Sequence, residues 1–146
     1  MTMKTSQTRS HSGLAEDLRI SIARLSRRLR RQGSHSLTIT QYAALAAVNQ
    51  HSSMTPRDLA EHEKVQPPSM TRVIAALEER GLLERSAHPT DGRQVVLNAT
   101  DQGRALVREE RRRKEAWLSQ RLRELTPEER AILRQAAPIL QKLSKA

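Results

Sequence analysis

The sequence predicts a mainly α-helical fold with one small β-hairpin. Apolar residues recur three and four positions apart through most of the 146 residues, which is the spacing of one face of a helix. The exception is the stretch PTDGRQVVLN, residues 89–98, where a Pro-Thr-Asp-Gly turn precedes apolar residues that favour a strand. The preceding LLERS can supply the partner strand. A chain of this length corresponds to about one domain.

The N-terminal part of the chain predicts two helices. The first runs from about residue 13 to residue 31 and is followed by the stop signals Gly33 and Ser34. Thr40 is expected to cap the second helix. The apolar positions are Leu14, Leu18, Ile22, Leu25 and Leu29 in the first helix, and Ala44, Leu45 and Val48 in the second.

The next stretch, TPRDLAEHEKVQPPSMTRVIAALEERGLLER, predicts a short helix, a turn and a longer helix. Thr55 followed by Pro56 is a cap and first-turn pair that starts the short helix. Pro67 and Pro68 fit the first turn of the longer helix, where their missing N–H groups are not needed. Gly81 is expected to close that helix. The pattern is that of a helix-turn-helix.

The longer helix has two unlike faces. One face is apolar and carries Met70, Val73, Ile74 and Leu77. The other is small and polar near its N-terminal end, and carries Pro68, Arg72, Ala75, Ala76 and Glu79, flanked by Ser69 and Thr71. A helix in the major groove of DNA needs small residues for close approach, hydroxyls and arginine for bases or phosphates, and distant acids. The alternative is an ordinary amphipathic helix. The candidate DNA contacts are Pro68, Ser69, Thr71 and Arg72.

The hairpin favours the DNA interpretation, because a helix-turn-helix followed by a two-stranded hairpin is a winged helix. The wing tip would reach the neighbouring groove, where Arg93 can enter a narrow minor groove. Asp91 could brace its guanidinium, and Gly92 lies between them. These three residues are the candidate wing contacts. The alternative is a solvent-exposed arginine in a turn.

Two further helices follow the hairpin. Thr100 is expected to cap the first, whose middle, residues 108–115, has no apolar residue and should bridge two packed zones. Pro127 starts the last helix. The apolar positions of both terminal regions have no other element of the chain to pack against, so we expect a homodimer about a twofold axis. The candidate dimer contacts are Leu14, Leu18, Leu122, Ile132, Ile139 and Leu143. The predicted organisation is a disordered tail at 1–12, a helical dimerisation region at 13–37 and 104–146, and a DNA-binding core at 38–103.

Composition favours double-stranded DNA as the partner. The chain has 26 basic and 16 acidic residues and a net charge of +10, and 21 of the basic residues are arginine, which suits phosphate and guanine. With one Trp, one Tyr and no Phe, it has almost nothing on which to stack single-stranded bases. No apolar run approaches the roughly 18 residues of a membrane span, and no secretory signal begins the chain. We expect a cytoplasmic protein associated with the nucleoid through DNA.

Catalysis, metal binding and cofactors are not expected. The chain has no cysteine, which excludes disulfides, thiolate zinc sites and thiol redox sensing. The five histidines show no ligand spacing, and the glycines form no phosphate-cradling loop. Ser, His and Asp occur without a nucleophile elbow.

The stretch LAEHEKVQPPSMTRVIAALEERGLLERSAHPTDGRQVVLNATDQG resembles the core of the multiple-antibiotic-resistance regulator (MarR) family of bacterial winged-helix transcription factors. The matching features are the MTRVIAALEERGLLER passage, the wing residues Asp91 and Arg93, and the start of the fifth helix at Thr100 and Gly103. Ala99 departs from the family, which usually has leucine there, and is expected to loosen packing at the wing base.

The resemblance implies a homodimer, joined through its terminal helices, that binds a pseudo-palindromic operator. It implies that Ser69, Thr71 and Arg72 lie in the major groove and Arg93 in the minor groove. Repression and release by a small anionic or aromatic effector are also implied, while the operator, the genes and the effector's identity stay open. Two alternatives remain: a non-specific architectural DNA binder, and a peripheral membrane protein anchored by its basic first helix.

Overall fold

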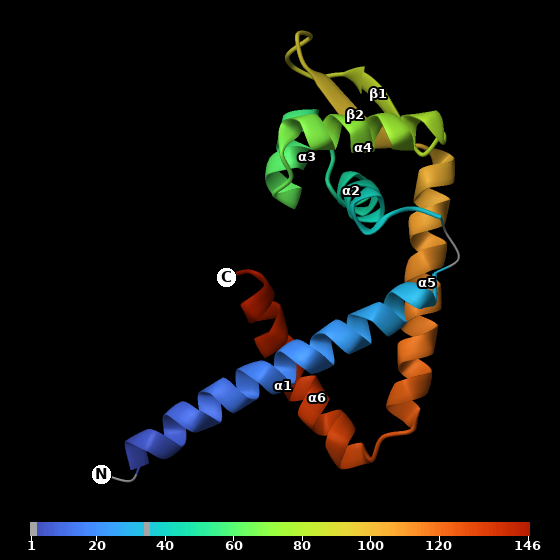
Figure 1. The fold of residues 1–146 in the computed structure, drawn as a ribbon. Coiled ribbons are helices and arrows are strands. Elements are labelled where there is room, and N and C mark those ends of the chain that lie inside the picture. Colours follow the sequence, from blue (N-terminus) through green and yellow to red (C-terminus); the bar gives the residue numbers. More distant parts are fainter. Residues whose placement is uncertain (1–2, 34–35) are drawn as a thin grey trace. The chain divides into compact units, whose positions relative to one another are not determined.

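The computed structural model describes residues 3–33 and 36–146, with side chains from Ser12 onward (Figure 1). Its elements are α1 (Met3–Arg31), α2 (Ile39–Gln50), α3 (Pro56–Glu63), α4 (Pro67–Glu79), β1 (Leu83–Ala87), β2 (Val95–Ala99), α5 (Asp101–Arg123) and α6 (Pro127–Ser144). The predicted fold class, mainly helical with one hairpin, is confirmed. None of the described helices is both long enough and apolar enough to cross a membrane.

The chain divides into two compact units. We call residues 34–112 the winged-helix unit, and residues 1–33 with 113–146 the terminal unit. The division falls within α5, between Arg112 and Arg113, which is further along that helix than the boundary at residue 103 expected from the sequence.

Two helix starts differ from expectation. Helix α1 begins at Met3 rather than near residue 13, so the segment expected to be a disordered tail is helical from Met3, and residues 1–2 lie outside the described chain. No proline interrupts this segment, and Gly13 lies inside the helix. Helix α2 is capped by Thr38 rather than Thr40, because Thr38 has Gln41 three residues later. The Gln41 N–H donates to the Thr38 hydroxyl and the Thr38 N–H donates to the Gln41 side chain, both at 3.1 Å.

The core of the winged-helix unit is made by α2, α3, α4, the hairpin and the first turns of α5 (Figure 1). Alanines of α2 let its backbone approach the neighbouring helices, and leucine, isoleucine and methionine side chains fill the space between them. The largest fully buried side chains are Leu45, Leu59, Met70, Ile74, Leu77, Leu97 and Val107. This unit therefore holds α4 and the hairpin on a packed scaffold.

The hairpin is antiparallel, with Leu83 opposite Ala99 and Ala87 opposite Val95. The Leu97 N–H also donates to the Met54 carbonyl at 2.8 Å, which ties the segment before α3 to the wing. Ala99 is buried in this pairing.

The junction of α4, β1 and α5 depends on two glycines. Gly81 closes α4 at φ 73°, a left-handed conformation that suits glycine, and the Leu82 N–H donates back to the Leu77 carbonyl at 2.9 Å. The Thr100 hydroxyl donates to the Gly81 carbonyl at 2.6 Å and accepts the Gly103 N–H at 3.0 Å, as a cap of α5 should. A Cβ on Gly103 would lie 2.2 Å from the Leu82 carbonyl oxygen, so this helix start requires glycine.

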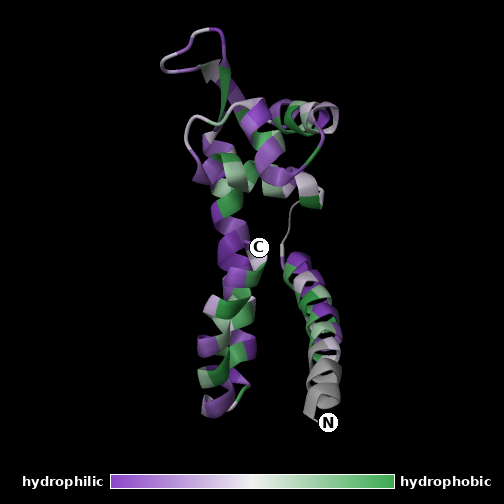
Figure 2. Cartoon of the chain, turned by 90° about the vertical axis from the view of Figure 1, so that its left-hand side faces the viewer, coloured by the Kyte–Doolittle hydropathy of each residue, from purple (hydrophilic) through white to green (hydrophobic). Residues whose placement is uncertain are grey.

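The terminal unit is built differently. Helix α6 has a capping box, in which Thr126 and Glu129 exchange hydrogen bonds of 3.0 and 3.1 Å, but none of its residues is buried. Apolar residues nevertheless recur along α1 and α6 (Figure 2). Arg28 of α1 lies over the Trp117 ring of α5, with its guanidinium carbon 5.1 Å from the ring centroid.

Candidate nucleic-acid interface

Helix α4 turns its apolar face into the core and its small, polar face outward. Met70, Ile74 and Leu77 are buried, whereas Val73 is only half-buried. The candidate contacts Pro68, Ser69, Thr71 and Arg72 are all exposed. Ala76, expected on the outward face, is also half-buried, and the predicted division of faces is otherwise confirmed.

The N-terminus of α4 is left open, unlike those of α2, α3 and α6. Its N-cap residue, Gln66, makes no side-chain cap hydrogen bond, and Pro67 and Pro68 have no N–H to satisfy. The first amide bonded within the helix is that of Met70, which donates to the Gln66 carbonyl at 3.0 Å. The Ser69 N–H therefore has no acceptor within the helix and lies at the positive end of the helix dipole, where an anion is favoured.

The hydroxyl proton of Thr71 is already engaged in a hydrogen bond within α4. The Thr71 hydroxyl donates to the Pro67 carbonyl at 2.9 Å, so toward solvent the side chain offers acceptor lone pairs and a methyl group. Beside it, the exposed Arg72 offers only donors. Together these two side chains can match both acceptors and donors on base edges.

The wing tip is shaped by Asp91, but not in the way expected from the sequence. The Asp91 carboxylate accepts the backbone N–H of Arg93 at 3.1 Å, so it fixes the turn instead of bracing the guanidinium. The Gln94 N–H donates to the Asp91 carbonyl at 3.0 Å. Gly92 and the Arg93 side chain are exposed.

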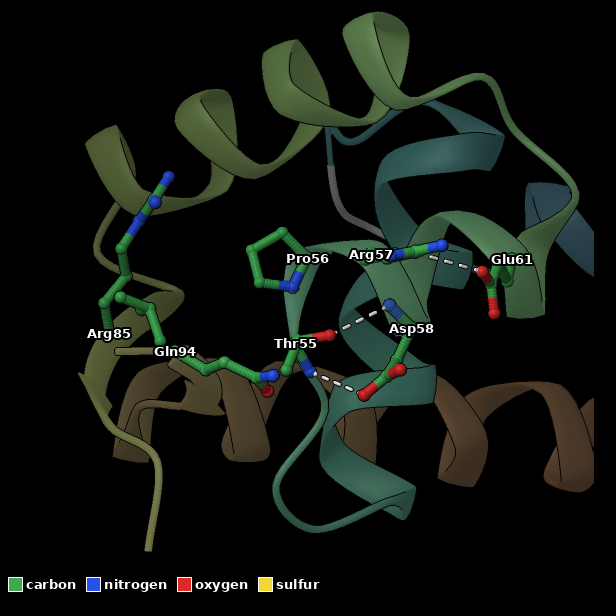
Figure 3. Close-up of a pocket in the computed structure, with 8 residues that line it drawn as sticks. Thr55, Pro56, Arg57, Asp58, Glu61, Arg85 and Gln94 are labelled. Carbon is green, nitrogen blue, oxygen red and sulfur yellow. Dashed lines mark hydrogen bonds and ion pairs between the residues drawn. The ribbon is translucent and has the colours of Figure 1, made fainter. Parts of the chain in front are cut away.

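A pocket of about 730 Å³ lies between the start of α3 and the hairpin (Figure 3). Its cations are Arg57, which is 3.4 Å from Glu61, and Arg85, whose Nη2 is 2.9 Å from Glu78 Oε1. The full lining is Thr55, Pro56, Arg57, Asp58, Glu61, Arg85, Gln94 and Val95. Sequence reasoning missed Arg85, because nothing in the spacing of β1 indicates that it pairs with a residue of α4.

The pocket also contains the α3 cap. The Asp58 N–H donates to the Thr55 hydroxyl at 3.0 Å, and the Thr55 N–H donates to the Asp58 carboxylate at 3.1 Å (Figure 3). The donated backbone N–H, followed by the Thr55 side chain, lowers the pKa of the Asp58 carboxyl below its usual value. Asp58 therefore stays ionised, so it and Glu61 place two carboxylates beside the pocket's two arginines.

The candidate dimer contacts all lie in the terminal unit and none is buried. Leu18 and Leu122 are half-buried, whereas Leu14, Ile132, Ile139 and Leu143 are more than half exposed. Leu14 and Leu18 share a face of α1, and Ile132, Ile139 and Leu143 share a face of α6, at helical spacing, whereas Leu122 lies near the end of α5. The described chain leaves much of these apolar stripes uncovered.

Comparison with known proteins places this geometry in a family. The model of the MarR family matches residues 37–95, which run from before α2 to the start of β2. The chain is 45% identical over 132 residues to an HTH-type transcriptional regulator of Mycobacterium bovis, covering 90% of this chain and 92% of the relative. It is 29% identical over 143 residues to the HTH-type transcriptional repressor MdtR of Bacillus subtilis, covering 94% and 90%.

The fold has close counterparts among solved structures. A transcriptional regulator protein of Pseudomonas aeruginosa superposes with a TM-score of 0.84 at 28% sequence identity, covering 94% of this chain and 97% of that one. The similarity therefore extends over both units and is not limited to the helix-turn-helix.

Proposed function

The chain belongs to the MarR family of DNA-binding transcriptional regulators, and we propose that it is a repressor that binds a pseudo-palindromic operator as a homodimer. The observation that carries the proposal is the outer face of α4, with its uncapped N-terminus and exposed Ser69, Thr71 and Arg72. In this proposal α4 occupies the major groove, Pro68 permits close approach, and Arg93 enters the adjacent minor groove, with Asp91 and Gly92 shaping its turn. The repressor role is supported by the name of the Bacillus subtilis relative.

The homodimer is supported by the uncovered stripes of the terminal unit. Ile132, Ile139 and Leu143 expose 64%, 61% and 59% of their surface. A second copy related by a twofold axis presents the same stripes, so each copy can cover those of the other. Two recognition helices would then meet two half-sites about one helical turn apart, roughly 34–36 Å. We expect such a dimer to work in the cytoplasm, on the nucleoid.

The effector part of the proposal rests on the pocket between α3 and the hairpin. Arg57 and Arg85 can donate to an anion that displaces them from Glu61 and Glu78, while Pro56 and Val95 offer apolar surface to a small aromatic ring. A ligand held there would alter how the wing stands relative to α4 and so weaken operator binding. Benzoate is a suitable probe, with uncharged benzamide as its matched control. Release of the operator by benzoate, but not by benzamide, is expected.

The test of DNA recognition is binding to duplexes tiled across the region upstream of the gene, against random duplex, over a salt series. One tile with an inverted repeat should be preferred by on the order of a thousandfold. Arg72→Ala and Arg93→Ala should each reduce that preference by roughly tenfold to a hundredfold, the size of one lost base contact. Arg134→Ala, which removes the same charge from the exposed side of α6, should not.

The alternative is a non-specific architectural DNA binder, which a net charge of +10 also favours. In that case all tiles bind alike, the salt dependence is steep, and the three arginine variants behave alike. That result would overturn the repressor proposal.

A further inference from the structure

The turn that carries Arg93 is closed at its base by His88. The His88 backbone N–H donates to the Gln94 carbonyl at 3.1 Å, just beyond the last paired residues of β1 and β2. His88 is also half-buried, whereas Pro89 and Thr90 are exposed. Its imidazole therefore lies against the turn and not in open solvent.

The His88 ring holds the backbone of the turn through one nitrogen. Nδ1 lies 3.2 Å from the Thr90 amide nitrogen and 3.1 Å from the Asp91 amide nitrogen. A backbone N–H can only donate, so Nδ1 must be the acceptor and must carry a lone pair. The geometry therefore requires a neutral imidazole with its proton on Nε2.

These hydrogen bonds continue to the wing tip. Asp91, whose N–H is held by His88, in turn accepts the Arg93 N–H on its carboxylate at 3.1 Å. The Gln94 N–H returns to the Asp91 carbonyl at 3.0 Å. The path from the imidazole to Arg93 thus consists of two successive hydrogen bonds through Asp91.

We propose that His88 is a positioning residue for Arg93: its neutral imidazole holds the turn that presents the guanidinium, and protonation at Nδ1 releases that turn. The role of the presented arginine rests on the proposed function, because it matters only if Arg93 contacts DNA. Operator affinity then falls in mild acid, where histidine is the side chain that changes charge.

The charges around His88 favour this release. The protonated ring would donate from both nitrogens, so it could no longer accept the Thr90 and Asp91 amides. The charged residues of the turn itself are Asp91 and Arg93. From α3, the Asp58 carboxylate interacts electrostatically with His88, and it attracts the imidazolium. This attraction therefore favours the charged ring.

The test compares the full-length protein with His88→Asn and His88→Ala. The asparagine Oδ1 stands one bond beyond Cγ, as Nδ1 does, and accepts the same amides in an Asx turn, but it does not titrate. His62→Asn is the matched control, because His62 is an exposed histidine of α3. Amide hydrogen exchange of Thr90 and Asp91, followed by NMR at about pH 8 and about pH 5.5, reports the turn without DNA.

We expect the Thr90 and Asp91 amides to be protected at the higher pH and to lose protection at the lower pH, beyond the intrinsic change of exchange rate. His88→Asn should keep protection at both values, and His88→Ala should lack it at both. Equal protection of the two amides at both pH values in the unaltered protein, or protection retained in His88→Ala, would overturn the proposal.

Operator affinity is the second readout. Acidification should weaken operator binding by the unaltered protein and by His62→Asn roughly tenfold more than it weakens binding by His88→Asn, the size of one lost base contact. An equal loss of operator affinity in the unaltered protein, His62→Asn and His88→Asn, with the amides behaving as expected, would mean that the turn does not present Arg93 to DNA. That result would also overturn the proposal. If no duplex is preferred at any pH, the proposed function fails, and the amide exchange alone decides whether His88 holds the turn.

Discussion

The two units follow the same rules of helix formation but differ in how far their apolar side chains are buried. In the winged-helix unit, leucines and methionines of α2, α3 and α4 are almost fully buried, and Leu45, Leu59 and Leu77 expose none of their surface. In the terminal unit, α6 starts with an equally complete capping box yet buries none of its residues. Local signals therefore define helices in both units, but they complete a core in only one.

The difference lies in whether the apolar stripe of a helix is covered by another element of the same chain. A helix with a continuous apolar stripe is stable when another element covers the stripe, and exposed stripes of this kind mark interaction surfaces. The winged-helix unit finds that cover within residues 34–112, whereas α1 and α6 present theirs outward. The first unit should therefore respond to changes in its own packing, and the second to changes in its association.

The largest effect is expected from Gly103→Ala in the winged-helix unit. The added Cβ meets the Leu82 carbonyl oxygen at 2.2 Å and Leu45 Cδ1 at 3.2 Å, and the first of these is backbone that cannot move aside cheaply. We expect destabilisation by about 1–3 kcal/mol, as for overpacked cores, although alanine is otherwise the better helix former by about 1 kcal/mol. Chemical denaturation measures the change.

The matched control for that substitution lies in the other unit. Gly13 is also inside a helix, but a Cβ there meets nothing within 4 Å. Gly13→Ala should leave stability unchanged or raise it by up to about 1 kcal/mol. Equal effects of the two substitutions would contradict the packing difference between the units.

The second effect, on association, is expected from Ile139→Glu. Ile139 is 61% exposed in the single chain, so the substitution should change the stability of one chain by less than about 0.5 kcal/mol. In a dimer that covers the stripe, it buries a charge and should dissociate the copies. Analytical ultracentrifugation distinguishes monomer from dimer.

The control is Gln141→Glu, which adds the same charge to the other side of α6 and should leave the dimer intact. A dimer that persists in Ile139→Glu would show that this stripe is not the interface.

Much of the winged-helix unit was predictable because its signals are local. Thr55 with Pro56, the pair Pro67 and Pro68, and Gly81 each punctuate a helix by their own backbone chemistry, and the structure has helix ends at these positions. The faces of α4 were predictable from spacing alone, since an α-helix repeats every 3.6 residues.

What the sequence did not reveal depends on geometry between elements or on competition between similar signals. Thr38 and Thr40 are both plausible caps, and the one followed by glutamine at the third position prevails. The Asp91 carboxylate had two possible partners in Arg93, and the nearer backbone N–H takes it. The pairing of Arg85 with Glu78, and of His88 with the turn amides, joins residues whose contact arises only when the hairpin folds.

The smallest effect is expected from the charge of Asp58 in the α3 cap. Its pKa is lowered in the folded protein, mainly by the Thr55 N–H, so its stabilising contribution is present above the ordinary pKa of an unfolded aspartate. That contribution is lost as the pH falls through the lowered, folded value. Asp58→Asn keeps an acceptor but removes the charge, and should destabilise the winged-helix unit at neutral pH by less than about 1 kcal/mol, because the site is exposed to solvent. Denaturation midpoints should therefore differ between the two proteins at about pH 7, and the difference should be smaller at about pH 3. A gap that stays the same at both pH values would mean that the side chain acts through shape and not through charge.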